Sequence, residues 1–214
     1  MAADKDIFKK LDEGRQYRDI CISNMELRAD GDSDSKKVHG YATKFNTKYM
    51  LWGYSDYEVW EQIAPHAFDE CDMSDVIMQY NHEGRVFARN SNGTLDLDID
   101  GVGLAIDAEL GGTTLGQQVY EEIAGGYTTK MSFGFSVGKD ERVTEEDHET
   151  GKIVVTRTIT KISKLYDVSA VSLPANDATS ISARSYSEGV IAELIEEVEK
   201  RKTLKQKLKI LAQI

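Results

Sequence analysis

Three residues of types that serve in acyl transfer stand in or next to apolar runs of the sequence. Ser132 lies in MSFGF, a run typical of a strand, and Gly134 within it is typical of a position that another group approaches closely. His82 ends the run VIMQYNH, and a neutral imidazole is a suitable base for a serine hydroxyl. Asp167 lies in KLYDVSAVSLP, where a buried carboxylate needs a partner. Together these types predict a nucleophile, a base and a carboxylate that orients the base.

Each of these residues also has a plainer interpretation. A serine inside a strand is usually structural, a histidine at a strand end usually faces solvent, and Asp167 could lie on a polar face. His148, in a loop rich in Glu and Asp, is a second candidate for the third member of the group. His39 and His66 have no candidate nucleophile near them in the sequence.

The acidic run DLDIDG at residues 96–101, followed by Asp107, matches much of the calcium loop of an EF-hand. An EF-hand needs a helix on each side, whereas both flanks here alternate apolar and polar residues as strands do. Gly103 also stands where an EF-hand usually has an apolar residue. A β-hairpin that turns at Asp100 and Gly101 explains the same aspartates as residues facing solvent.

The elements that must position these residues are mostly strands. From about Met25 to Pro174 the sequence consists largely of short alternating segments. One strong helix is expected over TTLGQQVYEEIAGG, which has apolar residues at spacing four and a glycine pair where a C-cap belongs. We therefore predict an α+β, mainly β fold: an antiparallel barrel, closed or nearly closed, flanked by a few helices. A closed barrel leaves no sheet edge exposed.

The chain divides into three parts by composition. Residues 1–22 form a polar N-terminal extension, in which Phe8, Leu11 and Ile20 could mark one face of a short helix. Residues 23–184 form the barrel domain. Residues 185–214 are expected to form an amphipathic helix, with Glu concentrated in its first half and Lys or Arg in its second, as suits the helix dipole. Its apolar stripe either packs on the barrel or binds a partner helix.

Composition restricts the partners and the compartment. The formal net charge of −11 and the pI of about 4.9 make nucleic acid an unfavourable partner. Cys21 and Cys71 form no metal-binding or redox motif, so two free thiols in a reducing compartment are expected, with no metal and no cofactor. The sequence has no apolar run of membrane-spanning length and no signal-peptide core at its start, which predicts a cytoplasmic protein without membrane contact.

Taken in order, several segments resemble the prohead (procapsid maturation) proteases of tailed phages, which are structural relatives of the herpesvirus assemblins. The resemblance covers about residues 25–180 and rests on MELRA, HGYATKFN, EQIAPHAF, YNHEGRVFARNSNGTLDLDIDGVGL, MSFGF and LYDVSAVSLPAND. It implies that His82 is the base and Ser132 the nucleophile. Assemblins use a second histidine as third member, whereas the phage relatives carry an acidic residue, here Asp167. His66 stands where the family usually has glycine.

The resemblance implies a serine endopeptidase that forms an acyl-enzyme. Its expected substrates are the scaffold or the scaffolding segment of the major capsid protein, and the protease itself, inside the prohead in the host bacterial cytoplasm. Substrate or oxyanion contacts are assigned to Phe133, Gly134, Ala175 and Asn176. A homo-oligomer is compatible with the resemblance, because assemblins dimerise. The alternative is a non-catalytic assembly factor that keeps the same fold and uses the C-terminal helix to bind scaffold.

Overall fold

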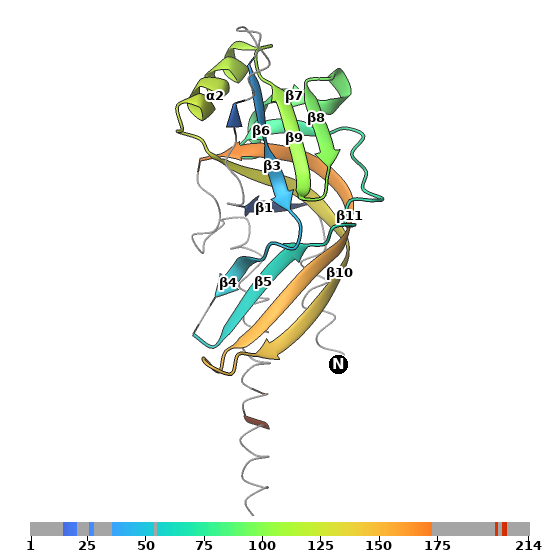
Figure 1. Ribbon diagram of the computed structural model, residues 1–214, viewed down its shortest axis with the longest axis vertical. Helices are drawn as coiled ribbons and strands as arrows, with labels where there is room; N and C mark the ends of the chain where they lie inside the picture. Colours follow the sequence, from blue (N-terminus) through green and yellow to red (C-terminus); the bar gives the residue numbers. More distant parts are fainter. Residues whose placement is uncertain are drawn as a thin grey trace, which may run out of the picture. The chain divides into compact units, whose positions relative to one another are not determined.

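The computed structural model of the chain describes residues 15–20, 26–27, 36–53, 55–172, 200 and 203–204. Residues Arg15–Ala178 form one compact unit, and that unit holds every strand (Figure 1). The strands are β1 (Gln16–Ile20), β2 (Glu26–Leu27), β3 (Lys37–Lys44), β4 (Tyr49–Gly53), β5 (Tyr57–Ile63), β6 (Ile77–Tyr80), β7 (Glu83–Arg89), β8 (Leu95–Ile99), β9 (Gly103–Glu109), β10 (Lys130–Glu146) and β11 (Ile153–Val171). The helical elements are the 3-10 turn η1 (Asn90–Asn92) and helix α2 (Thr114–Ala124).

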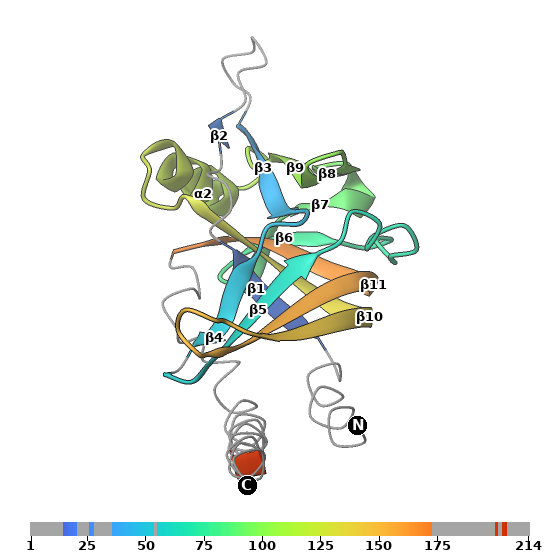
Figure 2. The same cartoon turned by 60° about the horizontal axis from the view of Figure 1, so that its bottom comes forward.

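The larger sheet is built around the long antiparallel hairpin of β10 and β11. Its main order is β1-β10-β11-β5-β4, as Figure 2 shows for the strands from β10 to β4. β11 pairs in parallel with β5 along its first half and in parallel with β6 along its second half, and β6 in turn pairs with β7. One strand of 19 residues therefore joins the β6–β7 hairpin to the rest of the sheet.

The predicted antiparallel barrel needs correction. The fold is mainly β, as expected, but the larger sheet is mixed, because β11 is long enough to hold two parallel neighbours one after the other. Within the described ranges the two sheets are open and do not close into a barrel. Parallel pairing joins segments that are distant in sequence, so the alternation of apolar residues could not reveal it.

The smaller sheet has the order β2-β3-β9-β8 and contains the predicted hairpin. β8 pairs antiparallel with β9, and the carboxylate of Asp100 accepts hydrogen bonds from the backbone N–H of Val102 (2.7 Å) and Gly103 (2.8 Å) in the turn. The hairpin interpretation of the acidic run is thus confirmed. Among the residues that the structure places, no group of three or more His, Cys, Asp or Glu side chains could hold a metal ion.

The core lies against one face of β10. Met131, Phe133 and Phe135 are completely buried there, and the last two rings stack at 4.6 Å between centroids. Burying one such side chain contributes about 1.5–3 kcal/mol. Because side chains alternate along a strand, this apolar set forces Ser132 and Gly134 onto the opposite face.

The predicted helix over residues 113–126 is confirmed as α2. Thr113 caps its N-terminus by accepting from the N–H of Gly116 at 3.0 Å, and Gly125 ends it. Val119 and Ile123 are buried, as their spacing indicates, whereas Leu115 is 39% exposed. α2 is the one complete α-helix in the described part of the chain, and the few helices expected beside the strands stay a prediction for the other residues.

The two ends of the chain are described only in part. Ile20, assigned to a short helix by its spacing, lies instead in strand β1, which pairs with β10. Phe8 and Leu11 lie outside the described residues. Lys200, Thr203 and Leu204 are helical, and the remainder of the predicted C-terminal helix is also outside the described residues. The proposed boundaries at residues 23 and 184 stay predictions. No described helix has the length and apolar character needed to cross a bilayer.

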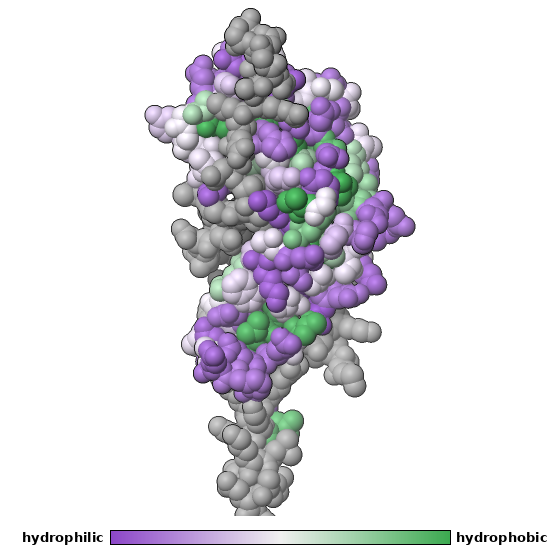
Figure 3. All heavy atoms as spheres, in the orientation of Figure 1, coloured by the Kyte–Doolittle hydropathy of each residue, from purple (hydrophilic) through white to green (hydrophobic). Residues whose placement is uncertain are grey.

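The loop that joins β10 to β11 is polar. The tip of the β10–β11 hairpin, at the lower end of the described unit, is covered by hydrophilic residues (Figure 3). This tip contains Asp147, whose carboxylate accepts from the backbone N–H of Glu149 (2.8 Å) and Thr150 (3.1 Å). The polar tip matches the charged loop of the sequence. Ser132 and Asp167 lie at the other end of the hairpin.

Candidate active site

One face of the sheet gathers the side chains of interest. The register pairs Tyr17 of β1 with Gly134 of β10, and Gly134 with Asp167 of β11. Two residues before Gly134 on β10, Ser132 pairs with Ser169 of β11. Directly paired residues share a face of a sheet, as do residues two apart on one strand. All five residues therefore lie on the face of the larger sheet opposite to Phe133 and the core.

His82 reaches this face from a two-residue turn. Asn81 and His82 connect β6 to β7 with φ values of 50° and 59°, the pattern of a type I′ hairpin. Two successive non-glycine residues in the left-handed region are uncommon, and such strain is typical of functional positions. The N–H of Asn81 donates to the carbonyl of Ala170 at 2.9 Å, and the N–H of His82 donates to Ser169 Oγ at 3.3 Å. These bonds fasten the turn to β11.

The structure brings Ser132, His82 and Asp167 together. His82 Nδ1 lies 2.5 Å from Asp167 Oδ1, and His82 Nε2 is hydrogen-bonded to Ser132 Oγ. The arrangement fits the tautomer in which Nδ1–H donates to the carboxylate and Nε2 accepts from the hydroxyl. Ser132 and Asp167 are fully buried, and the His82 side chain is 11% exposed. Such a chain of contacts can remove the hydroxyl proton and stabilise the resulting imidazolium.

The carboxylate of Asp167 has three polar partners. Besides His82, it accepts from the guanidinium of Arg15 and from Ser169 Oγ, the latter at 3.0 Å. Burial on its own raises the pKa of Asp167. The hydrogen bond and charge of His82, followed by those of Arg15, outweigh burial, so the pKa of Asp167 lies below its ordinary value. The group is therefore ionised at neutral pH, as an acceptor for imidazolium must be.

Gly134 provides the space in which these groups meet. A Cβ atom at this position would lie 2.3 Å from Asp167 Oδ2, 2.9 Å from Tyr17 Cε1 and 3.1 Å from Arg15 Nε. Gly134 is not among the glycines with positive φ, so its backbone conformation is open to any residue. Space, rather than conformational freedom, is what requires glycine here.

Three residues that the sequence did not indicate complete the site: Arg15, Tyr17 and Ser169. The Tyr17 ring lies 4.3 Å from the His82 ring, centroid to centroid, at 55°. Ser169 Oγ lies 3.2 Å from His82 Nδ1 in addition to its bond with Asp167. Ser169 could have been found, because it stands two residues after Asp167 on a strand and so shares its face. Arg15 and Tyr17 belong to a polar segment with no pattern that marks them.

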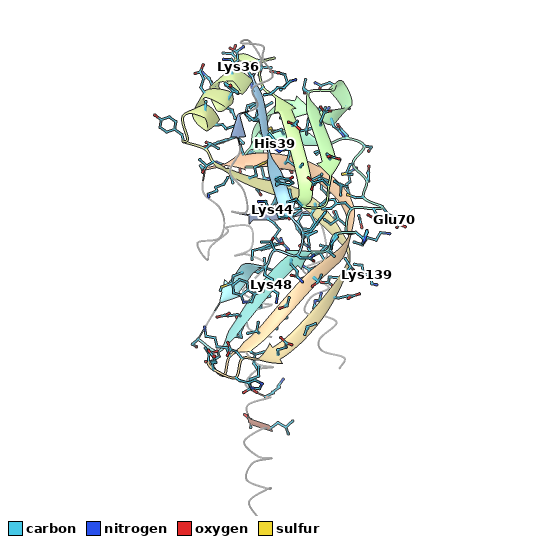
Figure 4. All side chains as sticks on the ribbon, viewed as in Figure 1. Lys36, His39, Lys44, Lys48, Glu70 and Lys139 are labelled. Carbon is cyan, nitrogen blue, oxygen red and sulfur yellow. The ribbon has the colours of Figure 1, made fainter. Side chains whose placement is uncertain are left out.

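The other candidates lie elsewhere. His39, on β3 of the smaller sheet (Figure 4), has Nδ1 3.3 Å from Asp107. His66 is exposed, with Nδ1 3.2 Å from Asp69 in the turn after β5. His148 lies in the polar tip of the β10–β11 hairpin, at the end remote from Asp167.

Among the residues predicted to contact substrate, Phe133 and Gly134 lie inside β10, between β1 and β11, and the Phe133 side chain is buried in the core. Ala175 and Asn176 are outside the described residues. The position of an oxyanion-binding group therefore stays a prediction.

A buried serine hydroxyl, an imidazole and an ionised carboxylate in this order have the geometry of a Ser–His–Asp triad. The family model of the caudovirus prohead serine proteases matches residues 23–193, most of the chain. The protein belongs to this family of tailed-phage proteases, whose role is in capsid maturation. Neither a curated protein nor a solved structure matches the chain.

Proposed function

We propose that this chain is a serine endopeptidase in which Ser132 is the nucleophile, His82 the general base and Asp167 the group that orients His82. The observation that carries the proposal is the continuous contact from Asp167 through both ring nitrogens of His82 to Ser132 Oγ. The membership of the chain in the prohead serine protease family supports the same reaction class.

The reaction follows from this arrangement. Ser132 Oγ attacks the carbonyl carbon of the peptide bond while its proton passes to His82 Nε2, and the imidazolium is stabilised by Asp167. The tetrahedral intermediate collapses when the imidazolium donates that proton to the leaving amine, which leaves an ester on Ser132. Water then attacks the ester carbonyl, with His82 again as base, and the carboxylic acid product leaves as the Ser132 hydroxyl is restored.

Hydrogen-bond donors must hold the oxygen of the intermediate, each lowering the barrier by about 3–4 kcal/mol. We assign this task to backbone N–H groups among Phe133, Gly134, Ala175 and Asn176. Phe133 and Gly134 are supported by their position next to the hydroxyl along β10.

The substrates proposed are the scaffold, or the scaffolding segment of the major capsid protein, and the protease itself, inside the prohead in the host cytoplasm. The family supports capsid or scaffold proteins as substrates. Residues 185–214 would bind scaffold during packaging, and a chain that lacks them should fail to enter proheads. Packaging at the normal level without these residues would refute that role. A homo-oligomer stays a prediction.

The chemistry is tested with a fluorophosphonate probe, which reacts only with an activated serine, and with cleavage of scaffold. Ser132→Ala should abolish labelling and cleavage, and His82→Ala should reduce both by about a thousandfold or more, because neither the nucleophile nor its base can be replaced by water. His66→Ala, which alters an exposed histidine, is the matched control and should behave as the unaltered chain. Cleavage at the normal rate by a folded Ser132→Ala protein would refute the assignment. A non-catalytic assembly factor would show no labelling in any variant.

A further inference from the structure

We propose that β1 is a releasable strand that closes the active site, and that an extended segment of the substrate takes its place along the edge of β10. The inference rests on the proposed function, because it concerns how a peptide reaches Ser132. The family match begins at residue 23, so β1 lies before the segment that the family shares.

β1 forms the edge of the larger sheet and has β10 as its neighbour. Its five residues pair antiparallel with Met131–Phe135 of β10, the stretch that contains the nucleophile. An antiparallel partner places its main chain about 5 Å from the strand it pairs with. β1 thus occupies the position next to Ser132 that an added peptide strand would take.

Arginines hold β1 on both faces of the sheet. On the catalytic face, Arg15 donates to Asp167. On the opposite face, Arg18 donates to both carboxylate oxygens of Glu61, with Nε 2.5 Å from Oε1 and Nη2 3.2 Å from Oε2. Asp167 and Glu61 are both completely buried, so the acceptor of each bond is shielded from water, although the Arg15 side chain is 34% exposed.

The nucleophile is closed off from solvent while β1 is docked. Ser132 has no exposed surface, and the Tyr17 ring packs on the His82 ring. Reaction requires a carbonyl carbon within about 3–3.5 Å of the serine oxygen. A substrate therefore cannot reach Ser132 until a neighbouring group moves, and β1 carries the ring that lies on the base.

Release of β1 would also create the binding surface. The edge of β10 would then present the N–H and C=O groups that now bond to β1, and an exposed edge is a template for an extended peptide. A polypeptide substrate in extended conformation fits this edge by main-chain hydrogen bonds. Freed N–H groups of β10 next to Ser132 would be available to the oxygen of the intermediate.

Arg18 allows the docking of β1 to be weakened without altering the catalytic face. Arg18→Ala removes the bonds to Glu61, while Glu61 keeps Arg157 Nη1 at 3.0 Å and the hydroxyl of Tyr49 at 2.5 Å. The loss of one charged hydrogen bond changes an equilibrium about tenfold or more. We therefore expect Arg18→Ala in the full chain to label with the fluorophosphonate about tenfold faster than the unaltered protein.

Lys152→Ala is the matched control, because Lys152 Nζ bonds to Glu58 at 2.8 Å in an ion pair that includes neither Glu61 nor a residue of β1. It should label at the unaltered rate. A synthetic peptide with the sequence of residues 15–20 should slow labelling of the Arg18→Ala chain, and a scrambled peptide should not. Melting curves establish that each variant is folded.

Unchanged or slower labelling of folded Arg18→Ala would overturn the inference and make β1 a fixed part of the site, while leaving the proposed function intact if labelling still depends on His82. Labelling in none of the proteins would overturn the inference together with the proposed function.

Discussion

Replacing Gly134 by alanine places one methyl group where three residues of the site converge. The new Cβ would lie 2.3 Å from Asp167 Oδ2, about 1 Å closer than the 3.4 Å at which ordinary contact begins. Moving the carboxylate by about 1 Å tilts His82 away from Ser132, and a misplacement of this size costs about a hundredfold in rate. Overpacking costs about 1–3 kcal/mol in stability, whereas the lower entropy of the unfolded chain returns about 0.4–1 kcal/mol. The net expectation is a folded protein, less stable by about 1–2 kcal/mol and about a hundredfold less active.

Two measurements test this expectation: the rate of fluorophosphonate labelling and the free energy of unfolding from urea titration. Gly138→Ala on the same strand is the matched control. A Cβ there would meet Ser163 Oγ at 2.6 Å and Lys161 Cγ at 3.0 Å, atoms of side chains at an exposed position that can rotate away. Normal labelling by Gly134→Ala, with a stability equal to that of Gly138→Ala, would refute the argument that this glycine makes room for Asp167.

Three further predictions follow from the same site and its surroundings. Ser169→Ala removes a hydrogen bond from Asp167 and one of the two bonds that fasten the His82 turn, and should slow labelling about tenfold, whereas Ser163→Ala on the exposed side of β11 should not. The pKa of Asp167 is lowered on folding, so the ionised carboxylate stabilises the protein at pH values above the ordinary pKa of 3.8, and this contribution is lost as the pH falls through the lowered pKa. In urea titrations from pH 6 to about pH 2, the free energy of unfolding of Asp167→Asn should therefore depend less on pH than that of the unaltered protein. An equal dependence on pH in the two proteins would contradict the assignment. Burial raises the pKa of Cys71 to about 11 from 9.0, so a Cys21→Ser chain should carry about a hundredfold less thiolate at pH 7 than an ordinary thiol; iodoacetamide labelling at the rate of free cysteine would show that Cys71 is not shielded.

Local parts of the fold could be predicted because their causes are local. The alternation of Met131, Phe133 and Phe135 with smaller residues fixes which face of β10 meets the core, and so where Ser132 points. The turn at Asp100 is set by hydrogen bonds within three residues of it. In each case the stabilising contacts are with residues a few positions away, so a local sequence pattern is enough to predict the structure.

The parts of the fold and site that the sequence did not predict depend on contacts between residues far apart in the chain. β1 is short and polar, and it is held by arginines whose acceptors lie 43 and 152 residues away, so its strand conformation has no local cause. The parallel partners of β11 are equally remote. For the site, His82 lies 50 residues from Ser132 and 85 from Asp167, and resemblance to a family, rather than spacing, connected the three. The left-handed backbone of His82 is imposed by its turn and gives no pattern in composition.

The position of β11 has a consequence for synthesis on the ribosome. The β6–β7 hairpin, which carries His82, joins the larger sheet through β11, the last strand of the described unit to be made. Ribosomes add about 5–20 residues per second, and N-terminal parts of a chain fold first. A nascent chain whose strand β11 has not yet emerged from the ribosome therefore cannot use Asp167 or the strand that fixes the His82 turn. The contacts among Ser132, His82 and Asp167 can therefore form only after β11 has been made.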